Sequence, residues 1–276
     1  MDDPSRTDDS GKDARRAQKM ADRAAARAQA ASERTRQRLE AKLALRAEEE
    51  ARRAAGYGYY LSGAEKKIDV RTLRPFGELA ARVIAEEQST MDVDRFYTLW
   101  QAVGLAPRGF PFVEVGAHKG ASARFIALAM EEHHHAQPFY VCDTFAGHPR
   151  ADPILDPVHY GSEKFTDTSP AAVSAYLSPH ANVRLVVGDF IETSASLPAE
   201  ARFGLVHVDV DVHPATAFCL DFFSSRLAPG GWIVVDDYGF LTCPGARRAV
   251  DDFVATHPAF RMLHLLTGQC LLVRPS

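Results

Sequence analysis

The alternation of apolar and polar residues along the second half of the chain predicts repeated strand and helix units. Short apolar runs of strand length are separated by segments whose apolar residues fall at helical spacing. The predicted strands cover residues 110–115, 139–142, 183–187, 205–208, 232–235, 260–266 and 269–274. Pro229, Gly230 and Gly231 predict a stop before the fifth strand, and Thr267-Gly268 predicts a hairpin between the last two. Strands that alternate with helices are typical of an open α/β sheet whose strands run mostly parallel.

The first 108 residues show no strand pattern and divide into two parts. Residues 1–55 are a charged tail rich in alanine and arginine, which we expect to be disordered or a solvated helix because it has few large apolar residues. Residues 56–108 begin with the segment GYGYYLS and continue with helical patterns at 72–87 and 93–103. We expect an N-terminal helical or lid region there, followed by one α/β domain over residues 109–276.

Charge and composition exclude several classes of partner. The tail carries a balance of +3 and residues 56–276 a balance of −7, which together give the net charge of −4. An acidic body argues against binding nucleic acid through its phosphates. The sequence has no signal peptide and no stretch that could span a bilayer, and its four cysteines are scattered without a C-x-x-C pair. We expect a cytoplasmic protein with reduced cysteines and with neither a nucleic acid nor a membrane partner.

Carboxylates follow two neighbouring predicted strands at the end where each strand stops. Asp209 and Asp211 follow residues 205–208, and Asp236 and Asp237 follow residues 232–235. Ligands of an open α/β sheet bind where the carboxyl ends of its strands meet. A single aspartate there would be explained as a cap for the next turn. Several together would repel one another without a cation, and their oxygens suit a hard divalent ion, so the pattern favours a metal site.

A glycine loop follows the first predicted strand. Glu114, Gly116 and Gly120 form the pattern E-x-G-x-x-x-G before a predicted helix that starts near Ala121. A dinucleotide fingerprint would require glycine at positions 118 and 121, where this chain has none. The pattern is that of the first motif of class I S-adenosylmethionine-dependent methyltransferases. Glycine there lets the backbone approach the methionine part of the ligand.

Two further turns fall on the same side of the predicted sheet. Asp143 ends the second strand, where a carboxylate can accept hydrogen bonds from ribose hydroxyls or cap the following turn. Gly188 and Asp189 end the third strand, where we expect a turn that contacts adenine. Residues 145–168 are predicted to be a long irregular loop on this side, placed to help cover a substrate.

Six blocks of sequence resemble the macrocin O-methyltransferase family over about residues 90–272. In chain order they are TLWQAV, VEVGAHKG, CDTFAGHP, VHVDVDVHPAT, LAPGGWIVVDDYG and CPGARRAVDDF. The enzymes of this family are metal-dependent and methylate sugar hydroxyls in bacterial natural products. The resemblance implies a Rossmann-like class I methyltransferase fold with a mostly parallel seven-stranded sheet, an antiparallel last strand and additional N-terminal helices.

The resemblance also implies a set of site residues. Asp209, Asp236 and Asp237 would bind Mg²⁺. The residues implied to line the S-adenosylmethionine site are Glu114, Gly116, Gly120, Ser122, Asp143 and Asp189, to which the predicted adenine turn adds Gly188. The chain departs from the family at one position, since His213 stands where the family pattern D-x-D-x-Y has tyrosine.

The resulting hypothesis is methyl transfer from S-adenosylmethionine to a hydroxyl of a sugar or glycosylated small molecule, with the hydroxyl activated by Mg²⁺. Asp209 or His213 would remove the proton. One alternative is a catechol-type O-methyltransferase, which uses the same metal chemistry on vicinal phenol hydroxyls. The other is a catalytically silent S-adenosylmethionine-binding scaffold that acts through the tail. Assembly into a homo-oligomer stays open.

Overall fold

The computed structural model describes residues 69–86 and 88–274, together with five isolated helical residues of the tail, Gln18, Lys19, Arg23, Gln29 and Arg36. The chain divides into two units, residues 1–62 and 63–276. The segment GYGYYLS and most of the tail lie outside the described residues, so the expected boundaries at 55 and 108 stay predictions. None of the described helices is long and apolar enough to cross a membrane.

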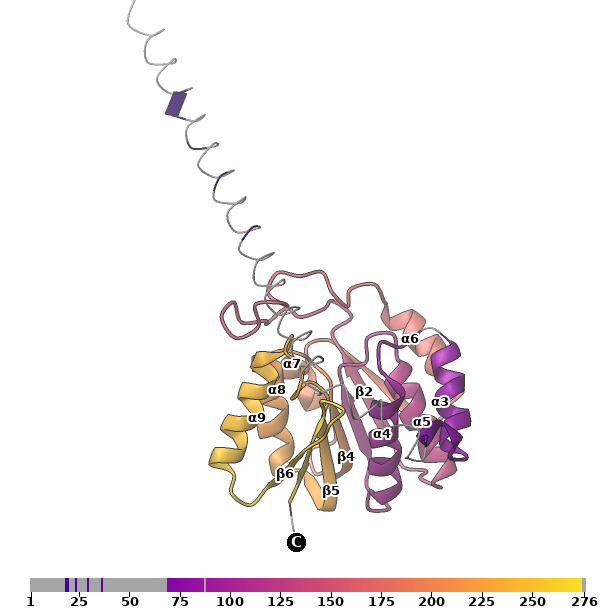
Figure 1. The fold of residues 1–276 in the computed structure, drawn as a ribbon. Coiled ribbons are helices and arrows are strands. Elements are labelled where there is room, and N and C mark those ends of the chain that lie inside the picture. The colour runs from indigo at the N-terminus through magenta and orange to yellow at the C-terminus, as the bar shows by residue number, and fades with distance from the viewer. Residues whose placement is uncertain are drawn as a thin grey trace, which may run out of the picture. The chain divides into compact units, whose positions relative to one another are not determined.

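A seven-stranded sheet with the order β3-β2-β1-β4-β5-β7-β6 forms the centre of the second unit (Figure 1). The strands are β1 (Phe112–Val115), β2 (Phe139–Asp143), β3 (Val183–Val187), β4 (Phe203–Val208), β5 (Leu227–Val235), β6 (Arg261–His264) and β7 (Cys270–Val273). Strands β1 to β5 pair in parallel, whereas β7 is antiparallel to both β5 and β6. The predicted fold class, a mostly parallel sheet that ends in an antiparallel strand, is confirmed.

Helices cover both faces of this sheet, with α3, α4 and α5 on one side and α8 and α9 on the other (Figure 1). The helices are α3 (Phe76–Ala85), α4 (Val93–Leu105), α5 (Ala121–Glu132), α6 (Pro170–Leu177), α7 (Phe190–Thr193), α8 (His213–Ser224) and α9 (Pro244–Thr256). Short 3₁₀ turns lie at Val70–Thr72 and Ser194–Ser196. The predicted helices at 72–87 and 93–103 correspond to α3, which begins later than expected, and α4.

The central strands are buried on both faces, which explains why they appear in the sequence as continuous apolar runs. On β4, Leu205 packs with the apolar side chains of α3, α4 and α5, while Val206 and Val208 pack with those of α8 and α9. Successive side chains of a strand point to opposite faces. Two polar residues, Glu114 and His207, therefore share the α3–α5 face, where they sit opposite one another in the β1–β4 ladder.

The predicted stop before residue 232 is wrong. Strand β5 begins at Leu227 and includes Pro229, Gly230 and Gly231. The ladder with β4 jumps from Phe203–Leu227 to Leu205–Trp232, so that the Pro-Gly-Gly segment bulges out of the pairing. A bulge accommodates extra residues on one strand without ending it. Gly230, with φ of +74°, supplies the backbone conformation that this requires.

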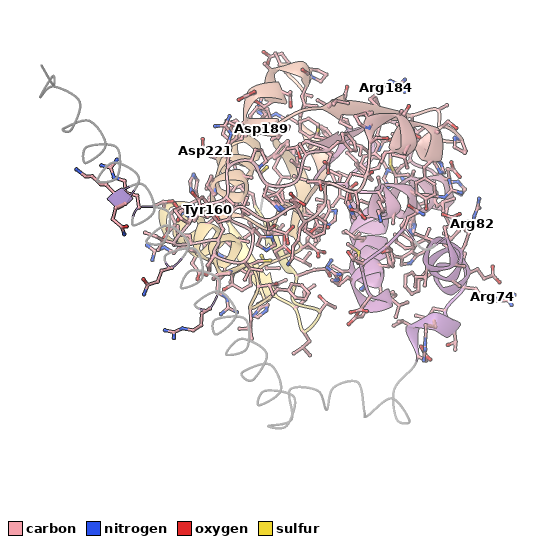
Figure 2. The ribbon with its side chains drawn as sticks, turned by 90° about the horizontal axis from the view of Figure 1, so that it is seen from above. Arg74, Arg82, Tyr160, Arg184, Asp189 and Asp221 are labelled. Atoms are coloured by element: carbon pink, nitrogen blue, oxygen red, sulfur yellow. The ribbon has the colours of Figure 1, made fainter. Side chains whose placement is uncertain are left out.

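The long loop between β2 and α6 contains turns and bends but neither helix nor strand over residues 145–168, as predicted. Its residues His148 and Phe165 line a cavity together with Gly188 and Asp209, which directly follow β3 and β4. The loop therefore lies at the end of the sheet where the parallel strands stop. Figure 2, which looks down on the molecule from above, shows Tyr160 of this loop and Asp189 after β3.

Candidate functional site

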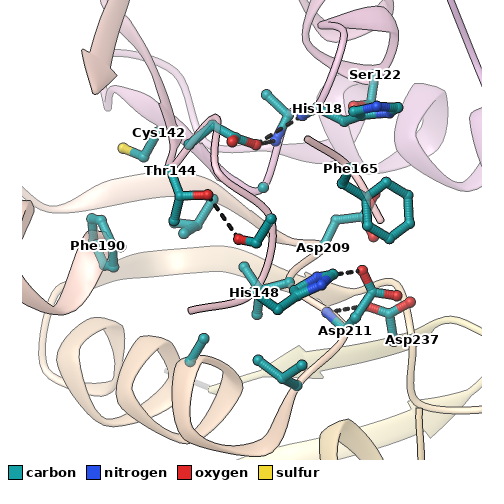
Figure 3. Close-up of a pocket in the computed structure, with 18 of the residues that line it drawn as sticks. His118, Ser122, Cys142, Thr144, His148, Phe165, Phe190, Asp209, Asp211 and Asp237 are labelled. Atoms are coloured by element: carbon teal, nitrogen blue, oxygen red, sulfur yellow. Dashed lines mark hydrogen bonds and ion pairs between the residues drawn. The ribbon is translucent and has the colours of Figure 1, made fainter. Parts of the chain in front are cut away.

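A cavity of about 260 Å³ opens at the carboxyl ends of the parallel strands (Figure 3). Its wall combines residues after β1, β2, β3, β4 and β5 with others from the segment before α4. Many of the predicted site residues line it, namely Gly116, Ser122, Asp143, Gly188, Asp189, Asp209 and Asp237. Four predicted residues lie outside this lining: Glu114, Gly120, His213 and Asp236. The structure therefore brings most of the predicted methyl-donor residues and part of the predicted metal site to one cavity.

Gly116 brings the loop after β1 into close contact with the end of β4. Its φ is +90°, and a Cβ atom there would lie 1.8 Å from the carbonyl oxygen of Asp209. No residue with a side chain fits at that distance. The N–H of Gly116 donates to the carbonyl of Cys142 at 2.8 Å, which ties the loop to β2 as well. The same glycine thus shapes the predicted cofactor loop and positions Asp209 beside it.

Asp143 holds the loops around it through three backbone hydrogen bonds. Its Oδ2 accepts from the N–H groups of Ala117 at 2.6 Å and His118 at 2.8 Å, and its Oδ1 accepts from the N–H of Phe145 at 2.6 Å. The alternative stated from the sequence, a turn-capping role, is therefore present. A carboxylate has about four acceptor positions, so Asp143 keeps capacity for a ribose hydroxyl, and that role stays a prediction.

Gly188 and Asp189 form the turn after β3. Gly188 has φ of +128°, and Asp189 caps α7 by accepting from the N–H of Ile191 at 2.9 Å. The carboxylate of Asp189 also pairs with the guanidinium of Arg150, a cavity residue from the long loop that the sequence did not single out. The ion pair links the loop to the third strand at the edge of the cavity.

Asp209 and Asp237 present carboxylates to the cavity in an environment that disfavours their charged forms. Burial, followed by repulsion from Asp236, raises the pKa of Asp209 well above its ordinary value. Burial, followed by repulsion from Asp211 and Asp209, does the same to the pKa of Asp237. A cation held between these groups would favour their ionised forms.

Asp236 does not line the cavity and is fully buried. Its Oδ1 accepts from Gln269 Nε2 at 2.7 Å and lies 3.6 Å from His207 Nε2, while its Oδ2 accepts from the guanidinium of Arg95. Burial alone would raise the pKa of Asp236, but His207, Arg95 and Gln269 together hold it below its ordinary value. The third predicted metal ligand is thus engaged by groups of the chain itself.

Arg95 is a functional residue that the sequence did not indicate. It belongs to α4, lines the cavity and reaches a carboxylate 141 positions away along the chain. An arginine on an amphipathic helix is ordinarily explained as part of its solvated face. No local signal distinguishes Arg95 from that case, because its partner is set by tertiary packing alone.

Glu114 and His207 form a buried pair beneath the cavity. His207 Nδ1 lies 2.8 Å from Glu114 Oε1, and neither side chain is exposed. Burial alone would lower the pKa of His207, but its contacts with Asp236 and Glu114 raise it to about 10. This raised pKa favours the protonated form of His207, which lies between two carboxylates. Glu114 does not line the cavity, which differs from its predicted place in the wall.

His213 does not reach the cavity wall. It is the first residue of α8, and its N–H donates to Asp156 Oδ1 at 2.9 Å. The wall contains a different histidine, His148, whose Nε2 lies 3.0 Å from Asp211 Oδ2 (Figure 3). His148 belongs to the CDTFAGHP block. The block includes this residue, but nothing in the sequence predicts that it lies beside Asp211.

The donor set of the cavity fits a hard divalent cation in part. Mg²⁺ takes oxygen ligands and usually retains several waters, which suits the cavity-facing carboxylates of Asp209 and Asp237. Asp236 joins them only if Arg95 releases it. Within the described residues, ligand atoms come within 4.8 Å of one another in three groups: His207, Asp209 and Asp236; Asp211, Asp237 and Cys243; and His148, His159 and Asp211. The set Asp209, Asp236 and Asp237 therefore stays a prediction.

Comparisons with known proteins identify a methyltransferase domain. A family model described as "Methyltransferase domain" matches residues 113–238. The 8-demethyl-8-(2,3-dimethoxy-alpha-L-rhamnosyl)-tetracenomycin-C 4'-O-methyltransferase of Streptomyces olivaceus is 27% identical over 151 residues, or 51% of this chain and 56% of that one. The mycinamicin III 3''-O-methyltransferase of Micromonospora griseorubida is 27% identical over 157 residues, or 52% and 60%. The match spans less than two thirds of each relative.

Solved structures share the fold at low sequence identity. The O-methyltransferase NovP superposes with a TM-score of 0.59 at 20% identity, covering 68% of this chain and 83% of that one. The calicheamicin methyltransferase CalS11 gives 0.55 at 18% identity, covering 75% and 96%. The chain therefore has the class I methyltransferase fold, and its similarity to proteins named as O-methyltransferases supports the resemblance to the macrocin O-methyltransferase family.

Proposed function

We propose that this protein transfers a methyl group from S-adenosylmethionine to a hydroxyl of a sugar or glycosylated small molecule, with Mg²⁺ activating the hydroxyl. One observation carries the proposal: a single cavity joins the glycine loop at Gly116 to the carboxylates of Asp209 and Asp237. Both curated relatives are named as O-methyltransferases, and the one from Streptomyces olivaceus is named for a rhamnosyl compound. These names support the sugar class of acceptor.

The loops after β1, β2 and β3 would hold the methyl donor. Gly116 permits close approach of the backbone to the methionine part, whose carboxylate the N-terminus of α5 can meet. Gly120, the residue before α5, has φ of +87° and sets the start of that helix. Asp143 has acceptor capacity left for the ribose, and the Gly188-Asp189 turn, which lines the same cavity, would contact adenine.

The acidic end of the cavity would hold the acceptor. A bound Mg²⁺ would lower the pKa of an acceptor hydroxyl and orient it toward the sulfonium methyl group. Asp209 and Asp237 would provide its protein ligands, with Asp236 as a third after Arg95 moves. The carboxylate of Asp209 is the candidate to accept the hydroxyl proton, because it lies in the cavity wall beside the proposed Mg²⁺. The position of His213 outside that wall makes it a weaker candidate than Asp209.

The test is methyl transfer by the full-length protein to a panel of sugar, glycoside and catechol acceptors, with and without a chelator. We expect product with a sugar or glycoside, loss of turnover on chelation and recovery with Mg²⁺. Turnover of catechols alone would replace the sugar proposal with the catechol alternative. Tight binding of S-adenosylhomocysteine without Mg²⁺ binding or turnover would favour the silent scaffold.

Matched variants separate the metal role from the cofactor role. Asp209→Asn and Asp237→Asn should lose turnover while retaining affinity for S-adenosylhomocysteine, because each removes a carboxylate of the cavity wall and leaves the cofactor loops intact. Asp221→Asn, which neutralises an exposed carboxylate of α8 (Figure 2), controls for the loss of one negative charge. Full turnover in Asp209→Asn and Asp237→Asn would refute the metal assignment.

A further inference from the structure

Four side chains of mixed chemistry meet beside the cavity, and the proposed methyl transfer uses none of them. They are His148 and His159 from the loop after β2, Asp211 from the loop after β4, and Cys243 immediately before α9. We call them the His/Asp/Cys cluster. Three segments that are distant in sequence thus contribute two imidazoles, one carboxylate and one thiol to the same place.

The atoms of the cluster are spaced like the ligands of a tetrahedral metal. Asp211 Oδ2 lies 3.0 Å from His148 Nε2, and Asp211 Oδ1 lies 3.2 Å from Cys243 Sγ. His159 Nε2 lies 3.6 Å from Cys243 Sγ and 3.8 Å from Asp211 Oδ1. Zinc bonds of about 2.0–2.3 Å at tetrahedral angles place neighbouring ligand atoms about 3.3–3.8 Å apart. The two separations from His159 fall in this range, and those from Asp211 to His148 and to Cys243 are slightly shorter.

Both imidazole rings are oriented by the cluster. His159 and Cys243 are 2% exposed, so these two groups are withdrawn from water. The Nδ1 atoms of His148 and His159 are buried without a hydrogen-bond partner within the described part of the chain. The Nε2 atoms of both rings instead face Asp211, and that of His159 also faces Cys243 (Figure 3 shows His148 and Asp211).

We propose that the His/Asp/Cys cluster binds one transition-metal ion of the Zn²⁺ class, separate from the Mg²⁺ proposed at Asp209 and Asp237. Imidazole and thiolate ligands favour zinc-like ions, whereas Mg²⁺ takes oxygen ligands. The ligands are Nε2 of His148 and His159, one oxygen of Asp211 and Sγ of Cys243, which releases its thiol proton to solvent on binding. The assignment does not depend on the methyl-transfer reaction.

The ion would fix the wall of the cavity on the acceptor side. It would join the loop of residues 145–168 to the end of β4 and the start of α9. Without the ion, hydrogen bonds link these segments. The N–H of Asp211 donates to Asp237 Oδ2 at 3.0 Å, so an ion on Asp211 also steadies one of the proposed Mg²⁺ ligands. The site has a structural role next to the acidic end of the cavity.

The test uses untagged full-length protein that has been stripped with a chelator and titrated with Co²⁺ alone. We expect the near-ultraviolet charge-transfer band of a cobalt thiolate to saturate at one equivalent, whereas Co²⁺ bound to the carboxylates of the proposed Mg²⁺ site would give no such band. Zn²⁺ should displace Co²⁺, in line with the usual order of affinities, and a large excess of Mg²⁺ should not. Cys243→Ser should lose the band. His159→Gln should weaken Co²⁺ binding by at least about 10–100-fold. Changing even a residue that only hydrogen-bonds to a metal ligand produces a loss of that size.

The control variant is Cys219→Ala, which removes another buried cysteine, on α8, and should keep the band. A band that survives in Cys243→Ser, an absence of stoichiometric Co²⁺ binding, or displacement by Mg²⁺ would each overturn the proposal. X-ray absorption of the zinc-loaded wild-type protein gives a test without variants. The proposal requires one sulfur at about 2.3 Å beside nitrogen and oxygen ligands, and a shell without sulfur would refute it.

Discussion

Replacing Gly116 by alanine tests whether the close approach of two loops builds the site. The residue has φ of +90°, and a Cβ atom would lie 1.8 Å from the carbonyl oxygen of Asp209, where contacts under 3.0 Å essentially never occur. The left-handed backbone alone costs an alanine about 1–2 kcal/mol. The contact adds a second cost, because the loop and the end of β4 must move apart by about 1 Å.

Gly109 provides a matched control. Its φ of +85° is nearly the same, but a Cβ atom there would have nothing within 4 Å. Gly109→Ala should therefore show the backbone cost alone, a fall in melting temperature of about 2–8 °C for a domain of this size. Gly116→Ala should fall further. Turnover should also drop by about 100-fold, the usual effect of displacing a reacting group by 1 Å.

The assays are thermal unfolding, titration with S-adenosylhomocysteine and turnover, all on full-length protein. We expect Gly116→Ala to weaken cofactor binding as well, since the same loop borders the cavity. Equal melting temperatures for the two variants, with cofactor affinity and turnover unchanged at position 116, would refute the reasoning. The glycine would then be needed only for its φ angle.

Four further predictions concern charge and the tail. Asp236→Asn should cost about 3–5 kcal/mol in urea unfolding, because it leaves Arg95 and His207 buried without their partner; an unchanged midpoint would contradict this. Asp236 and Glu114 raise the pKa of His207 from 6.5 to about 10, although burial alone would lower it. The stability that charged His207 contributes to the fold is therefore complete below pH 6.5 and is lost as the pH rises through 10. The difference in unfolding free energy between wild type and His207→Gln should shrink over that range, and a constant difference would argue against a charged His207. Burial and repulsion from Asp236 and Asp211 raise the pKa values of Asp209 and Asp237, so protons compete with a cation for these carboxylates. Mg²⁺ should therefore raise the melting temperature more at pH 8 than at pH 6. Equal shifts at the two pH values would exclude that competition. Deleting residues 1–55, most of which lie outside the described residues, should leave melting temperature and cofactor affinity unchanged; a large fall in stability would mean that the tail packs on the domain.

The fold was predictable because each parallel strand is an apolar run that ends in a glycine or a carboxylate. These glycines and carboxylates mark where β1 to β5 stop, and parallel pairing then brings them together at one end of the sheet. Side-chain alternation extends the prediction further. It puts Glu114 and His207 on the same face as Phe112 and Leu205, and their buried pair follows from that parity.

Contacts between distant segments were not predictable. Asp236 and Asp237 are neighbours in sequence, yet one is held by Arg95 and the other lines the cavity. Which carboxylate meets a helix depends on how α4 packs against the sheet, and no periodicity encodes that. The sequence named His213 and not His148 for a similar reason, since the long loop places His148 beside Asp211 through tertiary contacts alone.

The contacts of Asp236 also show that the site needs more of the chain than the matched methyltransferase domain. Arg95 comes from α4 and Gln269 from the hairpin between β6 and β7, and both lie outside residues 113–238. Without Arg95 and Gln269, Asp236 would keep only His207 as a partner. Because His207 also pairs with Glu114, one of the two buried carboxylates would lack a positive partner of its own. A buried, unpaired charge is among the most destabilising features of a protein interior. The N-terminal helices and the final hairpin therefore belong to the architecture of the candidate site, because they supply the groups that let an acidic cluster exist at the end of the sheet.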